Sequence, residues 1–125
     1  MADGAYSGGA QLLTRGTTLQ VFSGTSAADT AQTISTPKDR PFKLLHIDVA
    51  YSAAPTQTGV TITLNSAAGA GYDTLLSTGT ANARYNVFIP EGGEMIYAAG
   101  DAIDVLAPAA GGTITSSISI YVEAF

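Results

Sequence analysis

Apolar and polar residues alternate along most of this chain, and a period of two predicts β-strands that bury one face. The clearest alternation covers residues 45–51, whose buried face is expected to hold Leu45, Ile47, Val49 and Tyr51. Further strands are predicted over 60–64, 85–89, 103–105 and 114–123, and weaker ones over 18–22, 30–36, 72–77 and 94–97. The chain is therefore expected to form eight or nine strands.

Turn-forming residues separate the predicted strands. Gly, Pro and Asp cluster at 52–56, 69–71, 90–93, 99–101 and 109–112. Short strands between closely spaced turns are typical of an all-β sandwich or barrel. No helical segment long enough for a parallel crossover is visible, so the sheets should be antiparallel. Residues 17–125 are expected to form an antiparallel two-sheet β-sandwich, jelly-roll-like; an immunoglobulin-like sandwich is the alternative, although its Cys…Trp…Cys pattern is missing.

Residues 1–16 differ from the rest, because they hold four glycines and show no sustained alternation. We expect an N-terminal arm there. It is either a frayed end or a segment docked on a partner through Leu12, Leu13 and Arg15. Asp3 stands where a secretory signal needs a base, and no apolar run follows, so no signal peptide is expected.

Composition narrows the function classes. The chain has 125 residues, enough for one domain, and its 46% hydrophobic content excludes a solvated disordered chain. Only 12% of the residues are charged, the net charge is −5, and the five bases are scattered, so neither nucleic acid nor a membrane surface is an expected partner. The absence of cysteine excludes disulfides, thiol catalysis and cysteine metal sites.

His46 is the only histidine and the first residue to test for catalysis. Alternation places it opposite the buried face, with Asp48 and Leu44 and near Phe42. An aspartate two residues away could orient a histidine base, but a triad also needs a nucleophile, and no G-x-S-x-G motif is present. We therefore expect a polar pair on an outward or interfacial face, no enzyme activity and no cofactor.

The carboxylates and tyrosines allow two weaker interpretations. Asp101 follows Gly100 and is expected to form a turn, while a surface calcium site using Asp101 or Asp73 stays open; no metal site is predicted. A sugar-binding surface would need exposed aromatic residues, for which Tyr6 and Tyr72 are the candidates. The tyrosines expected on or near core faces are Tyr51, Tyr85 and Tyr97.

Four segments carry a resemblance to a known group of proteins. They are FKLLHIDVAY at 42–51, GVTITL at 59–64, NVFIP at 86–90 and AGDAIDV at 99–105. Their order of strands and turns, over residues 17–125, resembles the small β-sandwich structural proteins of tailed bacteriophages, closest to capsid decoration (cement) proteins.

This resemblance implies a non-enzymatic virion structural protein that is made in the host cytoplasm and binds the capsid surface. Its partners would be the major capsid protein and copies of itself, as a homotrimer, and it would stabilise the assembled head. The alternative is a receptor- or carbohydrate-binding module of a phage fibre or tail.

Overall fold

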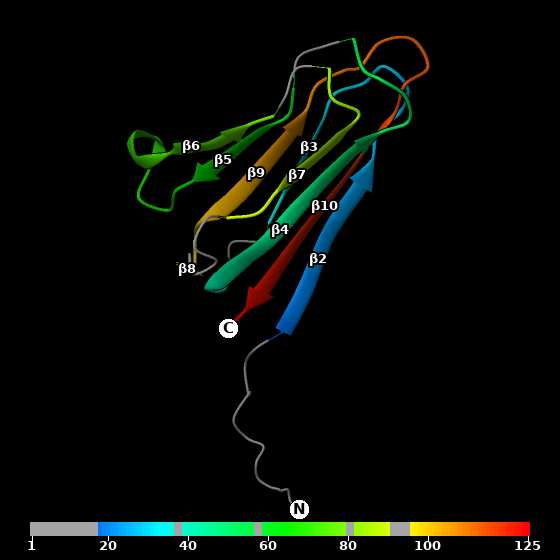
Figure 1. Ribbon diagram of the computed structural model, residues 1–125. Coiled ribbons are helices and arrows are strands. Elements are labelled where there is room, and N and C mark those ends of the chain that lie inside the picture. The colour runs from blue at the N-terminus through cyan, green and yellow to red at the C-terminus, as the bar shows by residue number, and fades with distance from the viewer. Residues whose placement is uncertain (1–17, 37–38, 57–58, 80–81, 91–95) are drawn as a thin grey trace, which may run out of the picture.

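The computed structural model describes residues 18–36, 39–56, 59–79, 82–90 and 96–125. Over these residues the chain forms nine strands in two antiparallel sheets, as the alternation predicts (Figure 1). The strands are β2 (Thr18–Thr25), β3 (Gln32–Ser35), β4 (Phe42–Tyr51), β5 (Thr61–Asn65), β6 (Thr74–Thr78), β7 (Tyr85–Phe88), β8 (Ile96–Tyr97), β9 (Ala102–Ala107) and β10 (Ser116–Ala124). A single-turn 3-10 helix, η1 (Ala70–Tyr72), precedes β6. The predicted arm 1–16, with Leu12, Leu13 and Arg15, lies outside the described residues.

The strand order identifies a jelly roll. One sheet has the order β2-β10-β4-β7, with β8 also paired to β4, and the other has the order β3-β9-β5-β6. The antiparallel partners are nested: β5 pairs with β6, β4 with β7, β3 with β9 and β2 with β10. A long hairpin that folds over into two sheets produces this nesting. The chain therefore forms the jelly-roll-like β-sandwich expected from its sequence.

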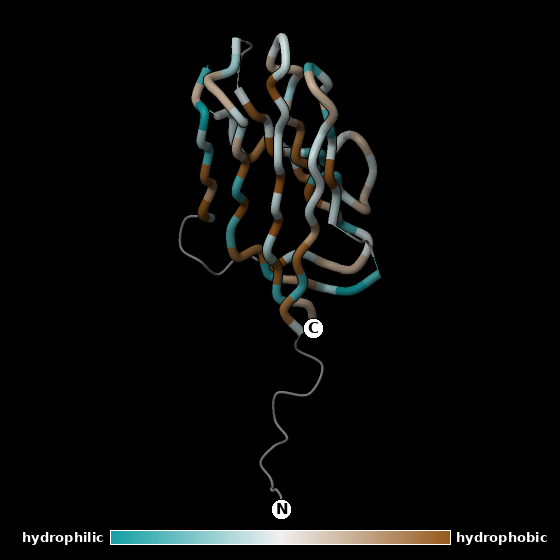
Figure 2. Tube along the Cα trace, turned by 90° about the vertical axis from the view of Figure 1, so that its right-hand side faces the viewer, coloured by the Kyte–Doolittle hydropathy of each residue, from teal (hydrophilic) through white to brown (hydrophobic). Residues whose placement is uncertain are grey.

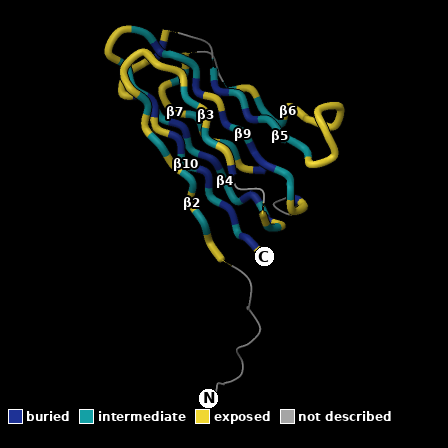
Figure 3. The backbone as a smooth tube through the Cα atoms, turned by 180° about the vertical axis from the view of Figure 1, so that it is seen from behind, coloured by how far each residue is buried: buried dark blue, intermediate teal, exposed yellow. Residues whose placement is uncertain are grey.

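The core lies between the two sheets, where β-branched and leucine side chains from both inner faces meet. Figure 3 shows the buried positions, in dark blue, along the strands of both sheets. Ile47, Ile118 and Ile120 of the five-stranded sheet are at most 1% exposed, as are Ile103 and Val105 of the other. Burial of such side chains supplies most of the free energy that holds the sheets together. Among the described residues, no helix has the length and apolarity needed to cross a membrane.

A β-bulge in β4 interrupts the predicted alternation. Tyr121 of β10 lies opposite His46, but the next residue, Val122, lies opposite Leu44, so Leu45 is an extra residue in β4. The extra residue moves Leu44 to the buried face, where it is 1% exposed, and leaves Leu45 only half-buried.

The bulge corrects two expectations from the sequence. The expected sharing of one face by Leu45 and Ile47 is wrong, and so is the grouping of Leu44 and Phe42 with His46. Beyond the bulge the predicted pattern holds, since Ile47, Val49 and Tyr51 are buried.

Candidate functional site

The outward side of the five-stranded sheet carries most of the large apolar residues that are exposed in the described chain. Seven lie on it or directly beyond its strand ends: Leu19, Val21, Tyr85, Val87, Ile89, Ile96 and Phe125. The remaining three are Tyr72, Leu75 and Leu106. We call this side the outer face. Figure 2 shows brown and paler positions alternating along its strands.

The strand register arranges the outer face in four rows that cross the sheet. From the chain's C-terminal end upward, the rows are Leu19–Glu123–Lys43–Ile96, Val21–Tyr121–His46, Ser23–Ser119–Asp48–Val87 and Thr25–Ser117–Ala50–Tyr85. Apolar side chains therefore occupy the two flanks, on β2 and on β7 with β8. The middle strands, β10 and β4, present small, polar and charged residues.

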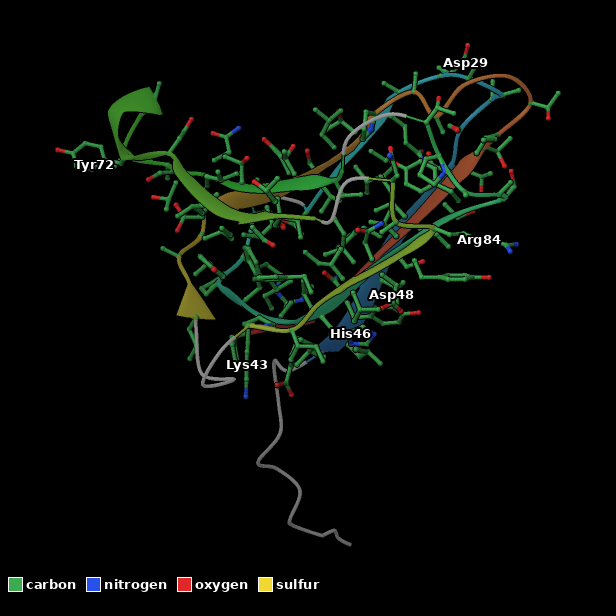
Figure 4. The ribbon with its side chains drawn as sticks, turned by 45° about the horizontal axis from the view of Figure 1, so that its top comes forward. Asp29, Lys43, His46, Asp48, Tyr72 and Arg84 are labelled. Atoms are coloured by element: carbon green, nitrogen blue, oxygen red, sulfur yellow. The ribbon has the colours of Figure 1, made fainter. Side chains whose placement is uncertain are left out.

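His46, Tyr121 and Asp48 form a cluster in the middle of the outer face. The imidazole stacks on the Tyr121 ring, with 4.1 Å between ring centroids and 15° between ring planes. His46 Nε2 lies 3.5 Å from Asp48 Oδ2, and the two side chains are 38% and 46% exposed. Figure 4 shows both residues side by side on β4.

The predicted outward polar pair is confirmed, and its surroundings are those of a surface. Ser119 lies across the ladder from Asp48, whereas His46 faces Tyr121. Among the described hydrogen bonds, none joins a hydroxyl group to His46. The cluster exposes the stacked rings of His46 and Tyr121 and the polar pair of His46 and Asp48 on the sheet surface. The expectation that the chain is not an enzyme remains a prediction.

The aspartates considered as calcium ligands hold loops together. Asp101 accepts hydrogen bonds from Ala67 N at 2.8 Å and Ala98 N at 3.2 Å, and Asp73 accepts one from Ser66 N at 2.8 Å. Both carboxylates therefore fix the loop that follows β5, and the predicted turn-forming role of Asp101 is confirmed. Within the described ranges, no group of three or more His, Asp or Glu residues is positioned to hold a metal ion.

A cleft opens between the sheets at their β6 and β7 edges. Its volume is about 330 Å³. Core side chains form its floor and polar side chains stand at its rim: Val49, Val60 and Ile62 below, and Ser77, Thr78 and Asn86 above. His46 and Asp48 do not line it.

The tyrosines divide between core and surface. Tyr51 and Tyr97 are buried, as predicted, and burial raises the pKa of both phenols; the Asp101 charge raises the pKa of Tyr97 further. Tyr85 was expected near the core but is 66% exposed, with the Arg84 guanidinium 5.2 Å from its ring centroid. Tyr72, on η1, is 68% exposed, as its sugar-binding role would need; Tyr6 lies outside the described residues.

The exposed apolar residues of β7 were not predicted from the sequence, because the side of this strand that carries Tyr85 was expected to face the core. Asn86 and Phe88 of β7 turn inward, so Tyr85 and Val87 are exposed. A signal was present in the sequence, since Val87, Phe88 and Ile89 are consecutive apolar residues and cannot all face one core.

No protein-family model matches this chain, and a search of curated proteins finds no match either. Fold and surface together define a jelly-roll β-sandwich with exposed apolar residues on both flanks of one sheet.

Proposed function

We propose that this chain is a non-enzymatic structural protein of a virion, and specifically a decoration protein that binds and stabilises the assembled head of a tailed bacteriophage. The observation that supports the proposal is the outer face. Its flanks expose Leu19, Val87 and Ile96 at 64%, 65% and 61%. Exposed apolar residues that gather on one side of a folded domain favour contact with another protein.

The energetics favour coverage by protein over exposure to water. Burying one aliphatic side chain of this kind contributes about 1.5–3 kcal/mol. Charged residues make up 12% of the chain, about half the roughly 25% of an average soluble domain, and those on the outer face lie in its middle strands rather than on the apolar flanks. A rigid sandwich with such a face suits a permanent place in an assembly.

The capsid is the assembly that we propose because of the resemblance carried by the segments 42–51, 59–64, 86–90 and 99–105. The partners would be copies of the chain, which would cover the outer face, and the major capsid protein, which would be contacted by the N-terminal segment with Leu12, Leu13 and Arg15.

Analysis of purified particles tests this proposal. The protein should be present on heads in hundreds of copies, as measured by quantitative mass spectrometry against the major capsid protein. Particles assembled without it should lose DNA at a lower temperature. Absence of the protein from particles, or only a few copies per particle, would contradict the decoration role.

A glycan- or receptor-binding module is the second candidate, and the cleft favours it. The cleft is lined by Asn86, Ser77 and Thr78, whose amide and hydroxyl groups can bind a sugar, and by Tyr85, whose side chain is 66% exposed. Glycan-array binding that Tyr85→Ala abolishes and Tyr72→Ala preserves would support this candidate. No signal above background with the intact chain would exclude it.

A further inference from the structure

We infer that the outer face pairs with the outer face of a second copy of this chain, across a two-fold axis that runs along the strands between β10 and β4. The inference rests on the proposed function and names the partner that covers this surface. Its support is the arrangement of residues that the strand register fixes.

A two-fold axis along the strands determines which residues meet. The rotation has no translation along its axis, so every row of one outer face lies over the same row of the other. Left and right are exchanged, which places β4 over β10 of the second copy and the β2 flank over the flank formed by β7 and β8. The contact is isologous, and each pairing occurs twice.

Charge is complementary under this operation. Lys43 and Glu123 belong to one row, so Lys43 of each copy lies over Glu123 of the other. In the next row His46 lies over Tyr121 of the second copy, and the two His46–Tyr121 stacks meet around the axis. A two-fold axis across the strands would place Lys43 over Ala50 instead, without this match. Complementary charge of this kind selects one docking register.

Shape is complementary as well. The apolar β2 flank of each copy lies over the apolar flank formed by β7 and β8 of the other, so that Leu19 lies over Ile96 of the second copy. In the two rows farther from the C-terminal end of β10, the side chains near the axis are short: Ser117 lies over Ala50, and Ser119 over Asp48. Small central residues allow two sheets to approach to about 10 Å, as in a β-sandwich.

The size of the face is sufficient. Strand β10 has nine residues and spans roughly 30 Å, and four neighbouring strands span roughly 19 Å including their side chains. Two such faces would bury on the order of 1,100 Å² in total, above the roughly 1,000 Å² that a specific interface needs.

A matched pair of leucines provides the first test. Leu19 on β2 and Leu75 on β6 are 64% and 60% exposed on edge strands, but they face outward from different sheets. Sedimentation equilibrium of the full chain should show a monomer–dimer equilibrium. Leu19→Lys should raise the dissociation constant at least tenfold, and Leu75→Lys should leave it within twofold. Equal effects of both variants would overturn the inference.

A charge exchange provides the second test. Glu123→Lys and Lys43→Glu should each weaken the dimer, because each brings like charges together on both sides of the axis, in the row at the C-terminal end of β10. The double variant should restore the dissociation constant to within about threefold of the parent. Because these residues are also neighbours within one chain, thermal unfolding of each variant is measured in parallel.

The outcomes separate this inference from the proposed function. A chain that stays monomeric at all concentrations, or that forms the homotrimer implied by the resemblance, overturns the two-fold pairing. The decoration role is then still decided by the copy number on particles. A dimer that follows the charge exchange but is absent from particles supports the pairing and contradicts the decoration role.

Discussion

At the scale of single residues, polar groups of this chain stabilise its loops. Asp101 and Asp73 accept hydrogen bonds from consecutive backbone amides, those of Ala67 and Ser66. Asp73 closes the loop between β5 and β6, and Asp101 joins that loop to the turn before β9. The turn-forming role of Asp101 could be predicted from the sequence, because it follows Gly100 and aspartate after glycine favours a turn, whereas Asp73 lies within the strand expected over 72–77. The contact of Asp101 with this loop could not be predicted, since it depends on the pairing of β5 with β9.

Replacing Asp101 tests this structural role. Asp101→Ala removes the acceptor of two backbone N–H groups and should lower the free energy of unfolding by about 1–3 kcal/mol in urea titrations. Asp48→Ala removes an aspartate from an exposed surface pair and should change it by less than about 1 kcal/mol. If the two variants lost equal stability, the role of Asp101 as a loop anchor would be refuted.

The buried tyrosines predict how stability depends on pH. Burial raises the pKa of Tyr51 and Tyr97 above the ordinary value of 10.0, so the folded state favours the neutral phenols. Their contribution to stability is complete below pH 10 and is lost as the pH rises further, because the unfolded chain ionises first. The urea midpoint should therefore fall above pH 10.

Tyr51→Phe removes one of these phenol groups and so measures its share of the stability lost at alkaline pH. The variant loses the bond from Tyr51 Oη to Pro108 O and starts less stable, but its midpoint should fall less steeply above pH 10. Tyr72→Phe, at an exposed position, is the matched control. An unchanged slope in Tyr51→Phe would show that burial of this phenol has no part in the alkaline loss.

At the scale of elements, alternation predicted where strands lie better than which way they face. The segments around 45–51 and 60–64 were recognised because their apolar residues alternate over five or more positions. The orientation of β7 and the bulge at Leu45 escaped prediction, since both depend on the partner strand: β10 sets the bulge and β4 sets the inward side of β7. Where both faces of a strand carry apolar residues, a period of two does not predict which face is buried in the core.

The turn between β8 and β9 requires a glycine at position 100. Gly100 has φ +98°, and a Cβ there would lie 2.7 Å from Ala67 Cβ. Gly100→Ala should therefore lower the unfolding free energy by at least about 1–2 kcal/mol. Gly71→Ala, in η1, meets no atom within 4 Å and should be nearly neutral. Equal thermal midpoints for the two variants would contradict this account of the turn.

At the scale of the whole molecule, the jelly roll separates two unlike surfaces. The outer face of the five-stranded sheet carries seven exposed large apolar residues on its flanks and strand ends, whereas the outward side of the four-stranded sheet carries two, Leu75 and Leu106, among Thr61, Thr63 and Asp104. The sandwich could be predicted from strands and turns alone. The contrast between its two sides could not, because it follows from the strand order, which places β2 and β7 at opposite edges of one sheet.

Deleting residues 1–16 tests how independent the sandwich is of its N-terminal segment. The truncated chain should keep its β-type circular dichroism spectrum, because β2 begins at Thr18 and is fully paired with β10. Its attachment to particles should weaken strongly, with little dependence on salt, since the segment holds one acid and one base. Co-sedimentation equal to that of the full chain would show that the segment makes no contact.

Hydroxyl-radical footprinting of side chains tests the central claim most directly, because it reads which sheet is covered when the protein is assembled. Dilute isolated protein is compared with concentrated protein and with purified particles. The account predicts protection of Val21, Val87 and Tyr121 on the outer face, and unchanged labelling of Leu75 and Leu106 on the opposite sheet. Protection of Leu75 and Leu106, with the outer face still labelled, would contradict it.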